Sequence, residues 1–135
     1  MKKINHIGIA VKNLAETLPF YTETLGLEFK GQDEVESEGV KVAFLSIGES
    51  NLELLEPRHD DSPIAKYIEK RGEGIHHIAL EVDDIHTRLE QMKSQGIRTI
   101  NDQPKEGAHG TQVAFLHPKA ANGVLYELCQ PKQEG

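Results

Sequence analysis

The chain has 135 residues, which is the size of one domain or of two half-domains that share a fold. Fifteen Lys and Arg residues against 22 Asp and Glu residues give a net charge of −7, the wrong sign for general nucleic-acid binding. No apolar run approaches the roughly 20 residues of a membrane span, and the lone Cys129 excludes an internal disulfide framework. We therefore expect a globular cytoplasmic domain, without a signal peptide, that binds neither nucleic acid nor a membrane.

The first half of the sequence is repeated in the second half. The matching blocks are 4–11 with 75–82, 42–45 with 113–116, and 53–57 with 127–131. A period of more than 70 residues is typical of a duplicated half-domain rather than of a solenoid. We therefore divide the single domain 1–135 into a first module at about 3–57, a connector at about 58–74 and a second module at about 75–131.

Each module begins with a predicted strand. Residues 4–11 alternate with a period of two, which places His6 and Gly8 on the same face of the strand. In the second module, His77 and Ala79 occupy the matching positions. Small residues beside a histidine, on the face away from the predicted helix, indicate a cavity wall.

A helix and three further strands follow in the first module. Asn13 or Thr17 caps the helix, Pro19 favours a late start or a kink, and Gly26 stops it. The predicted strands are 27–32, 40–47 and 51–56.

The connector and the second module show the same kinds of signal. Ser62 and Pro63 start a short connector helix that ends at Gly72. The helix of the second module is capped by Asp83 or Asp84 and ends at Gly96. Its apolar stripe consists of Ile85, Leu89 and Met92. The predicted strands are 97–100, 111–117 and 124–130.

These elements predict an α+β fold of paired βαβββ modules. In each module the helix covers one face of the sheet and leaves the histidine-bearing face open. Two such sheets related by a pseudo-twofold axis would form a partly closed mixed β-sheet cavity with flanking helices.

Four residues that the repeat superimposes are typical metal ligands. His6 matches His77, and Glu53 matches Glu127. A carboxylate within an apolar strand is costly unless it is neutralised, although a single one could lie at a solvated edge, and a lone strand histidine is more often a hydrogen-bonded core residue. Because all four would converge on one axis, we interpret His6, Glu53, His77 and Glu127 as ligands of one metal ion.

The proposed ligand set favours a divalent ion with open coordination positions. Two imidazoles and two carboxylates suit Co²⁺, Zn²⁺, Ni²⁺, Mn²⁺ or Fe²⁺. A structural zinc site would more often use thiolates and be closed at four ligands. Open positions permit Lewis-acid chemistry on a substrate oxygen.

The chain resembles the vicinal oxygen chelate superfamily and, within it, the methylmalonyl-CoA epimerase family. The most specific motifs are GAHG at 107–110, VAFLHPK at 113–119 and GVLYEL at 123–128. Supporting motifs are NHIGIAV at 5–11, ELLEP at 53–57, SPIA at 62–65 and GIHHIA at 74–79. The resemblance covers essentially the whole chain.

The resemblance implies an isomerase that interconverts the (2R) and (2S) forms of methylmalonyl-CoA. A metal-stabilised enolate would form when the C2 proton is removed. The family's metal ligands match His6, Glu53, His77 and Glu127, and some members carry Gln at the position of Glu53. Glu127 is the best candidate for one proton transfer, whereas Val42 stands where some members carry a second catalytic glutamate. Glu53, water or a nearby polar group could serve the opposite face.

Other residues of interest have weaker assignments. Lys119 could meet the carboxylate or phosphates of a CoA ester, or it could be a solvated turn lysine. His76 should point away from His77 and be structural, and Cys129 lacks an adjacent base that would activate it. We expect an acyl-CoA thioester as the partner molecule and a homodimer as the assembly.

Two other functions remain open at this point. One is a glyoxalase-I-like isomerase of a glutathione hemithioacetal, which would use the same ligand set. The other is a non-catalytic binder of small molecules on the same scaffold, although such proteins can lack metal ligands and this chain keeps four.

Overall fold

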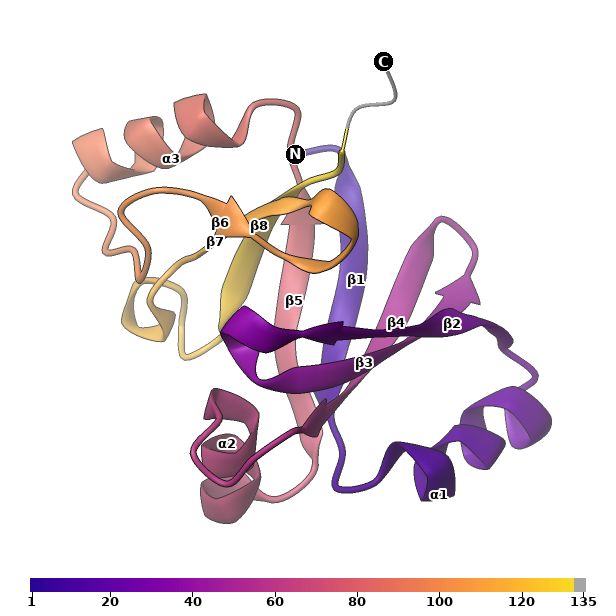
Figure 1. Cartoon of the computed structure of the whole chain (residues 1–135). Coiled ribbons are helices and arrows are strands. Elements are labelled where there is room, and N and C mark those ends of the chain that lie inside the picture. Colours follow the sequence, from indigo (N-terminus) through magenta and orange to yellow (C-terminus); the bar gives the residue numbers. More distant parts are fainter. Residues whose placement is uncertain (133–135) are drawn as a thin grey trace. The chain divides into compact units, whose positions relative to one another are not determined.

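The computed structural model describes residues 1–132 and shows the predicted mixture of helices and strands (Figure 1). The strands are β1 (Lys3–Ala10), β2 (Glu28–Val35), β3 (Val40–Ile47), β4 (Ser50–Pro57), β5 (Gly74–Glu81), β6 (Lys105–Glu106), β7 (Gln112–Phe115) and β8 (Tyr126–Gln130). The α-helices are α1 (Leu14–Pro19), α2 (Pro63–Arg71) and α3 (Ile85–Ser94). Within residues 1–132, no helix has the length and apolar character needed to cross a membrane.

The order of the strands reproduces the duplication. The mixed eight-stranded sheet runs β2-β3-β4-β1-β5-β8-β7-β6, so each module contributes its four strands in the same internal order. In each module the first strand pairs in parallel with the last, β1 with β4 and β5 with β8. The expected α+β fold of paired βαβββ modules is thereby confirmed.

The contacts divide the chain into two compact units. One unit is His6–His76, and the other combines Met1–Asn5 with the residues from His77 onward. Residues 1–5 belong to the second unit because they are hydrogen-bonded to Glu81. The Lys2 backbone amide donates to the Glu81 carbonyl at 2.9 Å, and the Asn5 side-chain amide donates to the Glu81 carboxylate at 2.9 Å.

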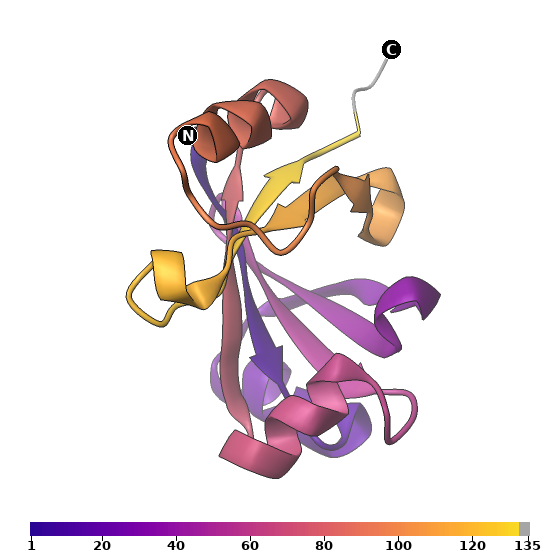
Figure 2. The same ribbon diagram turned by 90° about the vertical axis from the view of Figure 1, so that its left-hand side faces the viewer.

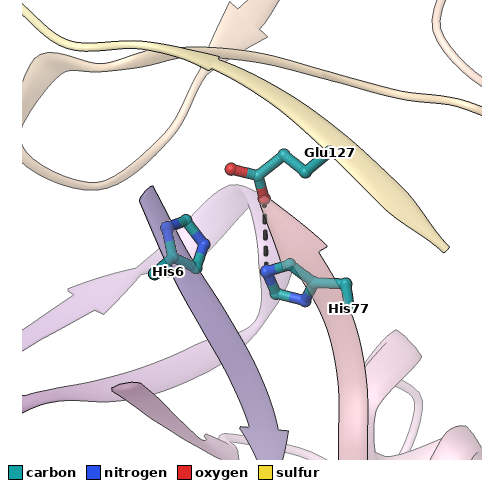
Figure 3. A group of neighbouring side chains, drawn as sticks. All are labelled: His6, His77 and Glu127. Atoms are coloured by element: carbon teal, nitrogen blue, oxygen red, sulfur yellow. Dashed lines mark ion pairs between the residues drawn. The ribbon is translucent and has the colours of Figure 1, made fainter. Parts of the chain in front are cut away.

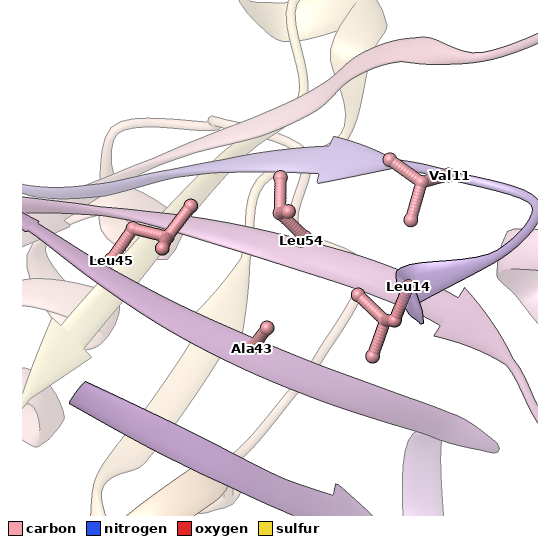
Figure 4. Close-up of a cluster of buried hydrophobic side chains, with 5 residues drawn as sticks. All are labelled: Val11, Leu14, Ala43, Leu45 and Leu54. Carbon is pink, nitrogen blue, oxygen red and sulfur yellow. The ribbon is translucent and has the colours of Figure 1, made fainter. Parts of the chain in front are cut away.

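The unit His6–His76 packs α1 against its sheet. Its core cluster is Val11, Leu14, Ala43, Leu45 and Leu54 (Figure 4). Asn13 caps α1 by accepting from the Glu16 amide at 3.0 Å. Pro19 has no amide hydrogen to donate, and beyond it the chain continues as a π-helix over Phe20–Thr24. The helix thus starts early, at Leu14, and the proline marks the change from α-helical to π-helical hydrogen bonding.

The connector helix also begins and ends as predicted. Ser62 caps α2 by accepting from the Ala65 amide at 3.1 Å, and Pro63 is its first residue. Gly72 follows the last turn with a φ of 78°, in the left-handed region that glycine adopts without strain.

The second unit packs α3 against β7 and β8 (Figure 2). Asp84, the second of the two expected caps, accepts from the Thr87 amide at 3.2 Å. The predicted stripe faces the core: Val82, Ile85, Leu89, Ala114 and Leu128 form a buried cluster, with Met92 packed against it.

The predicted strand at 97–100 is wrong. Only Thr99 forms a bridge, to Leu116, and the second strand of this module is the two-residue β6 instead. The Asn101 side chain accepts the Phe115 amide at 2.8 Å. Because this amide is then no longer available to a backbone carbonyl, the ladder ends there.

Candidate metal centre

His6 and Glu53 form the first half of the candidate centre. The parallel pairing of β1 with β4 places Gly8 opposite Glu53, and His6 lies two residues before Gly8 on the same face. The His6 Nδ1 atom lies 3.1 Å from Glu53 Oε2. The strand pairing thus determines which histidine meets which glutamate.

Burial perturbs both groups of this first pair. It lowers the pKa of His6 to about 4 and raises the pKa of Glu53 to about 8, because both lose the water that would solvate their charged forms. At neutral pH the metal-free pair is therefore mostly a neutral imidazole beside a protonated carboxyl. A divalent cation would stabilise the ionised carboxylate that burial disfavours.

His77 and Glu127 form the equivalent pair in the second module. The pairing of β5 with β8 places Ala79 opposite Glu127, so His77 stands to Glu127 as His6 stands to Glu53. His77 Nε2 lies 3.3 Å from Glu127 Oε1, and each side chain is only 7% exposed. Farther along the same face, Ala79 packs with Val113 and Cys129, and Cys129 is a buried free thiol.

Three of the four predicted ligands are grouped directly. One ligand atom from each of His6, His77 and Glu127 lies within 4.8 Å of the other two, and all three residues are buried (Figure 3). Glu53 is not in this group and is linked to it through its contact with His6. Two imidazole nitrogens and a carboxylate oxygen are a donor set that fits a divalent transition metal.

A phenylalanine flanks each histidine–glutamate pair at the same register. Phe44 is opposite Glu53 in the β3–β4 pairing, and Phe115 is opposite Glu127 in the β7–β8 pairing. The Phe115 ring meets the ring of His77 edge to face, with centroids 5.7 Å apart. Sequence reasoning missed this role, although the repeated VAFL segment carries the signal.

The other predicted residues lie as follows. Lys119 is exposed within the 3₁₀ turn Pro118–Ala120. Val42 is buried, and it lies on the same face of β3 as Phe44, so this face presents an apolar side chain where some family members carry glutamate. His76 packs edge to face against Tyr67 of α2 with centroids 5.0 Å apart, which agrees with its predicted structural role.

Comparison with known proteins agrees with this geometry. The model of the Glyoxalase/Bleomycin resistance protein/Dioxygenase superfamily matches residues 5–115. An ethylmalonyl-CoA/methylmalonyl-CoA epimerase from Cereibacter sphaeroides is 42% identical over 130 residues, covering 95% of this chain and 97% of the relative. A probable lactoylglutathione lyase from Vibrio cholerae is 30% identical over 132 residues, covering 97% and 92%.

The solved structures include a methylmalonyl-CoA epimerase in complex with methylmalonyl-CoA and NH4+. It matches with a TM-score of 0.93 and 39% sequence identity, covering 97% of this chain and 95% of that chain. The chain therefore belongs to the glyoxalase/bleomycin resistance protein/dioxygenase superfamily and, within it, to the methylmalonyl-CoA epimerase family.

Proposed function

We propose that this protein is a methylmalonyl-CoA epimerase that removes and returns the C2 proton of its substrate. The observation that carries the proposal is the buried grouping of His6, His77 and Glu127, in a chain 42% identical to a methylmalonyl-CoA epimerase over nearly its whole length. Burying ionisable groups together costs free energy unless their charge is compensated, and a bound cation would compensate the carboxylates.

The four predicted ligands would hold one divalent ion. His6 and Glu53 supply two donors from β1 and β4, and His77 and Glu127 supply two from β5 and β8. When bound, the ion supplies Lewis acidity that stabilises negative charge on a substrate oxygen. Co²⁺, Zn²⁺, Ni²⁺, Mn²⁺ and Fe²⁺ all suit these ligands.

Glu127 is the proposed group for proton transfer on one face of C2. Inversion needs a base on one face of the carbon and an acid on the other. By pseudo-symmetry, Glu53 is the corresponding group for the opposite face, since Val42 offers no carboxyl group there. The buried surroundings of both glutamates keep bulk water away from the proton in transfer.

A stereochemical assay in D₂O tests this proposal. Metal-loaded protein should convert (2R)-methylmalonyl-CoA to the (2S) form and introduce solvent deuterium at C2, as followed by NMR. Inversion without deuterium incorporation would exclude proton abstraction, and absence of inversion would exclude the epimerase.

A glyoxalase-I-like isomerase is the second candidate. It is supported by the 30% identity to the probable lactoylglutathione lyase from Vibrio cholerae, which is lower than the identity to the epimerases. Assaying the same metal-loaded preparation with a glutathione hemithioacetal separates the two functions. Turnover of the hemithioacetal alone would replace the epimerase by this candidate.

We propose further that the protein acts as a homodimer and that it does so in the cytoplasm. We also propose that Lys119 binds the phosphates of the CoA ester. The exposed apolar side chains of Phe20, Leu25, Phe29 and Ile47 support self-association. Light scattering after size-exclusion chromatography tests the assembly, and cell fractionation tests the compartment. Lys119→Met should weaken binding of every CoA ester to a similar degree.

A further inference from the structure

The ammonium group of Lys105 lies above the ring of Phe115. Its Nζ atom is 5.9 Å from the ring centroid, and the same ring forms a T-shaped contact with the His77 ring, with centroids 5.7 Å apart. Two successive ring contacts therefore connect a cation on β6 to a predicted metal ligand on β5. No motif in the sequence had drawn attention to Lys105.

The strand register places Lys105 on the face that carries Glu127. Lys105 is opposite Val113 in the β6–β7 pairing, and Phe115 is opposite Glu127 in the β7–β8 pairing. Residues directly opposite each other project to the same face, as do residues two apart in one strand. Lys105, Phe115 and Glu127 therefore share one face of the sheet.

The backbone of Phe115, whose ring contacts both Lys105 and His77, is hydrogen-bonded on both edges. The Phe115 amide donates to the Asn101 side chain at 2.8 Å, and the Phe115 carbonyl accepts from the Ile100 amide at 2.8 Å. On its other edge Phe115 pairs with β8. The ring that Lys105 and His77 both contact is therefore attached to a backbone that is hydrogen-bonded on both edges.

We propose that Lys105 binds the free carboxylate of the substrate and so selects a 2-carboxyacyl thioester over a plain acyl thioester. This inference rests on the proposed epimerase function. The chain carries a net charge of −7, so attraction of a substrate that bears a carboxylate depends on local cations, and Lys105 would add one to the proposed metal ion. An ammonium has three donors, so contact with a ring face is compatible with a charge-assisted hydrogen bond to a carboxylate.

The phosphates of the CoA tail are the other anions that Lys105 could bind. They lie at the far end of the pantetheine arm from the thioester, whereas the free carboxylate is attached to the reacting carbon itself. Since two ring contacts connect Lys105 to His77, the geometry favours the carboxylate.

Binding of two esters to metal-loaded protein tests the assignment. Methylmalonyl-CoA carries the carboxylate, while propionyl-CoA carries the same phosphates without it, and calorimetry gives both dissociation constants. We expect Lys105→Met to raise the dissociation constant of methylmalonyl-CoA by roughly 10- to 100-fold and to leave that of propionyl-CoA unchanged. Lys105→Arg should retain most of the preference, because it keeps the charge.

Lys93→Met is the matched control. Lys93 on α3 pairs with Glu90 at 3.2 Å, and its loss should change neither dissociation constant. If Lys105→Met weakened the binding of both esters equally, Lys105 would be assigned to the phosphates and the inference would be overturned. It would also be overturned if the variant kept the full preference for methylmalonyl-CoA over propionyl-CoA. If the wild-type protein neither prefers methylmalonyl-CoA nor epimerises it, the proposed function fails and the inference fails with it.

Discussion

Metal binding should displace a proton from Glu53. Burial raises the pKa of this carboxyl to about 8 in the metal-free protein, whereas a metal ligand must be ionised. A group with this pKa is about 0.9 protonated at pH 7 and about 0.1 protonated at pH 9. The wild-type protein should therefore release about 0.9 more protons than Glu53→Gln at pH 7, and only about 0.1 more at pH 9.

The same coupling sets the pH dependence of metal affinity. Below pH 8 each unit of acidification makes displacement of the Glu53 proton harder, so the wild-type affinity should fall about tenfold per unit relative to Glu53→Gln. Some family members carry Gln at this position, so we expect the variant to retain metal binding.

Titration calorimetry in two buffers with different ionisation heats counts the released protons directly. Glu69→Gln, on the exposed side of α2, is the control and should release as many protons as the wild type. If wild type and Glu53→Gln release equal numbers of protons at pH 7, the reasoning about this buried carboxyl is refuted.

Three further predictions concern the centre and its support. His77→Ala should abolish activity largely through metal loss, so elemental analysis should find the variant depleted in metal; a fully loaded but inactive variant would contradict this explanation. Asn101→Ala leaves the Phe115 amide without its acceptor and should cost about 1–3 kcal/mol in urea denaturation, whereas an unchanged midpoint would mean that water replaces the bond. His6 binds a proton in the unfolded chain below its ordinary pKa of 6.5 but in the folded chain only below about 4. The metal-free wild type should therefore lose up to about 3 kcal/mol relative to His6→Gln as the pH falls from 6.5 to 4, and parallel pH profiles of the two proteins would rule this out.

The duplication visible in the sequence extends to a structural detail that no pattern specified. Glu56 accepts from the Leu14 amide at the start of α1, and Gln130 accepts from the Ile85 amide at the start of α3, both at 2.9 Å. The repeat superimposes Leu14 on Ile85 and Glu56 on Gln130. Equivalent positions thus perform the same capping contact with chemically different side chains.

The errors of sequence reasoning lie where pairing is non-local. The segment 97–100 has β-branched and apolar residues typical of a strand, but Asn101 takes the amide that would extend its ladder. The contact between Lys105 and Phe115 escaped notice because nine residues, including a loop, separate them in the chain. They lie near each other only because β6 folds back on β7.

The amino-acid pattern by itself indicated the duplication, the candidate helix caps and four residues suited to a cation, because these depend on local periodicity and on the repeat. Only the tertiary structure decided that His6 meets Glu53, that His77 meets Glu127 and that Lys105 lies over the ring of Phe115. The physical reason is that strand register fixes which side chains share a face and at what distance. Register arises from hydrogen bonds between segments far apart in the chain, which a single sequence does not encode in any local signal.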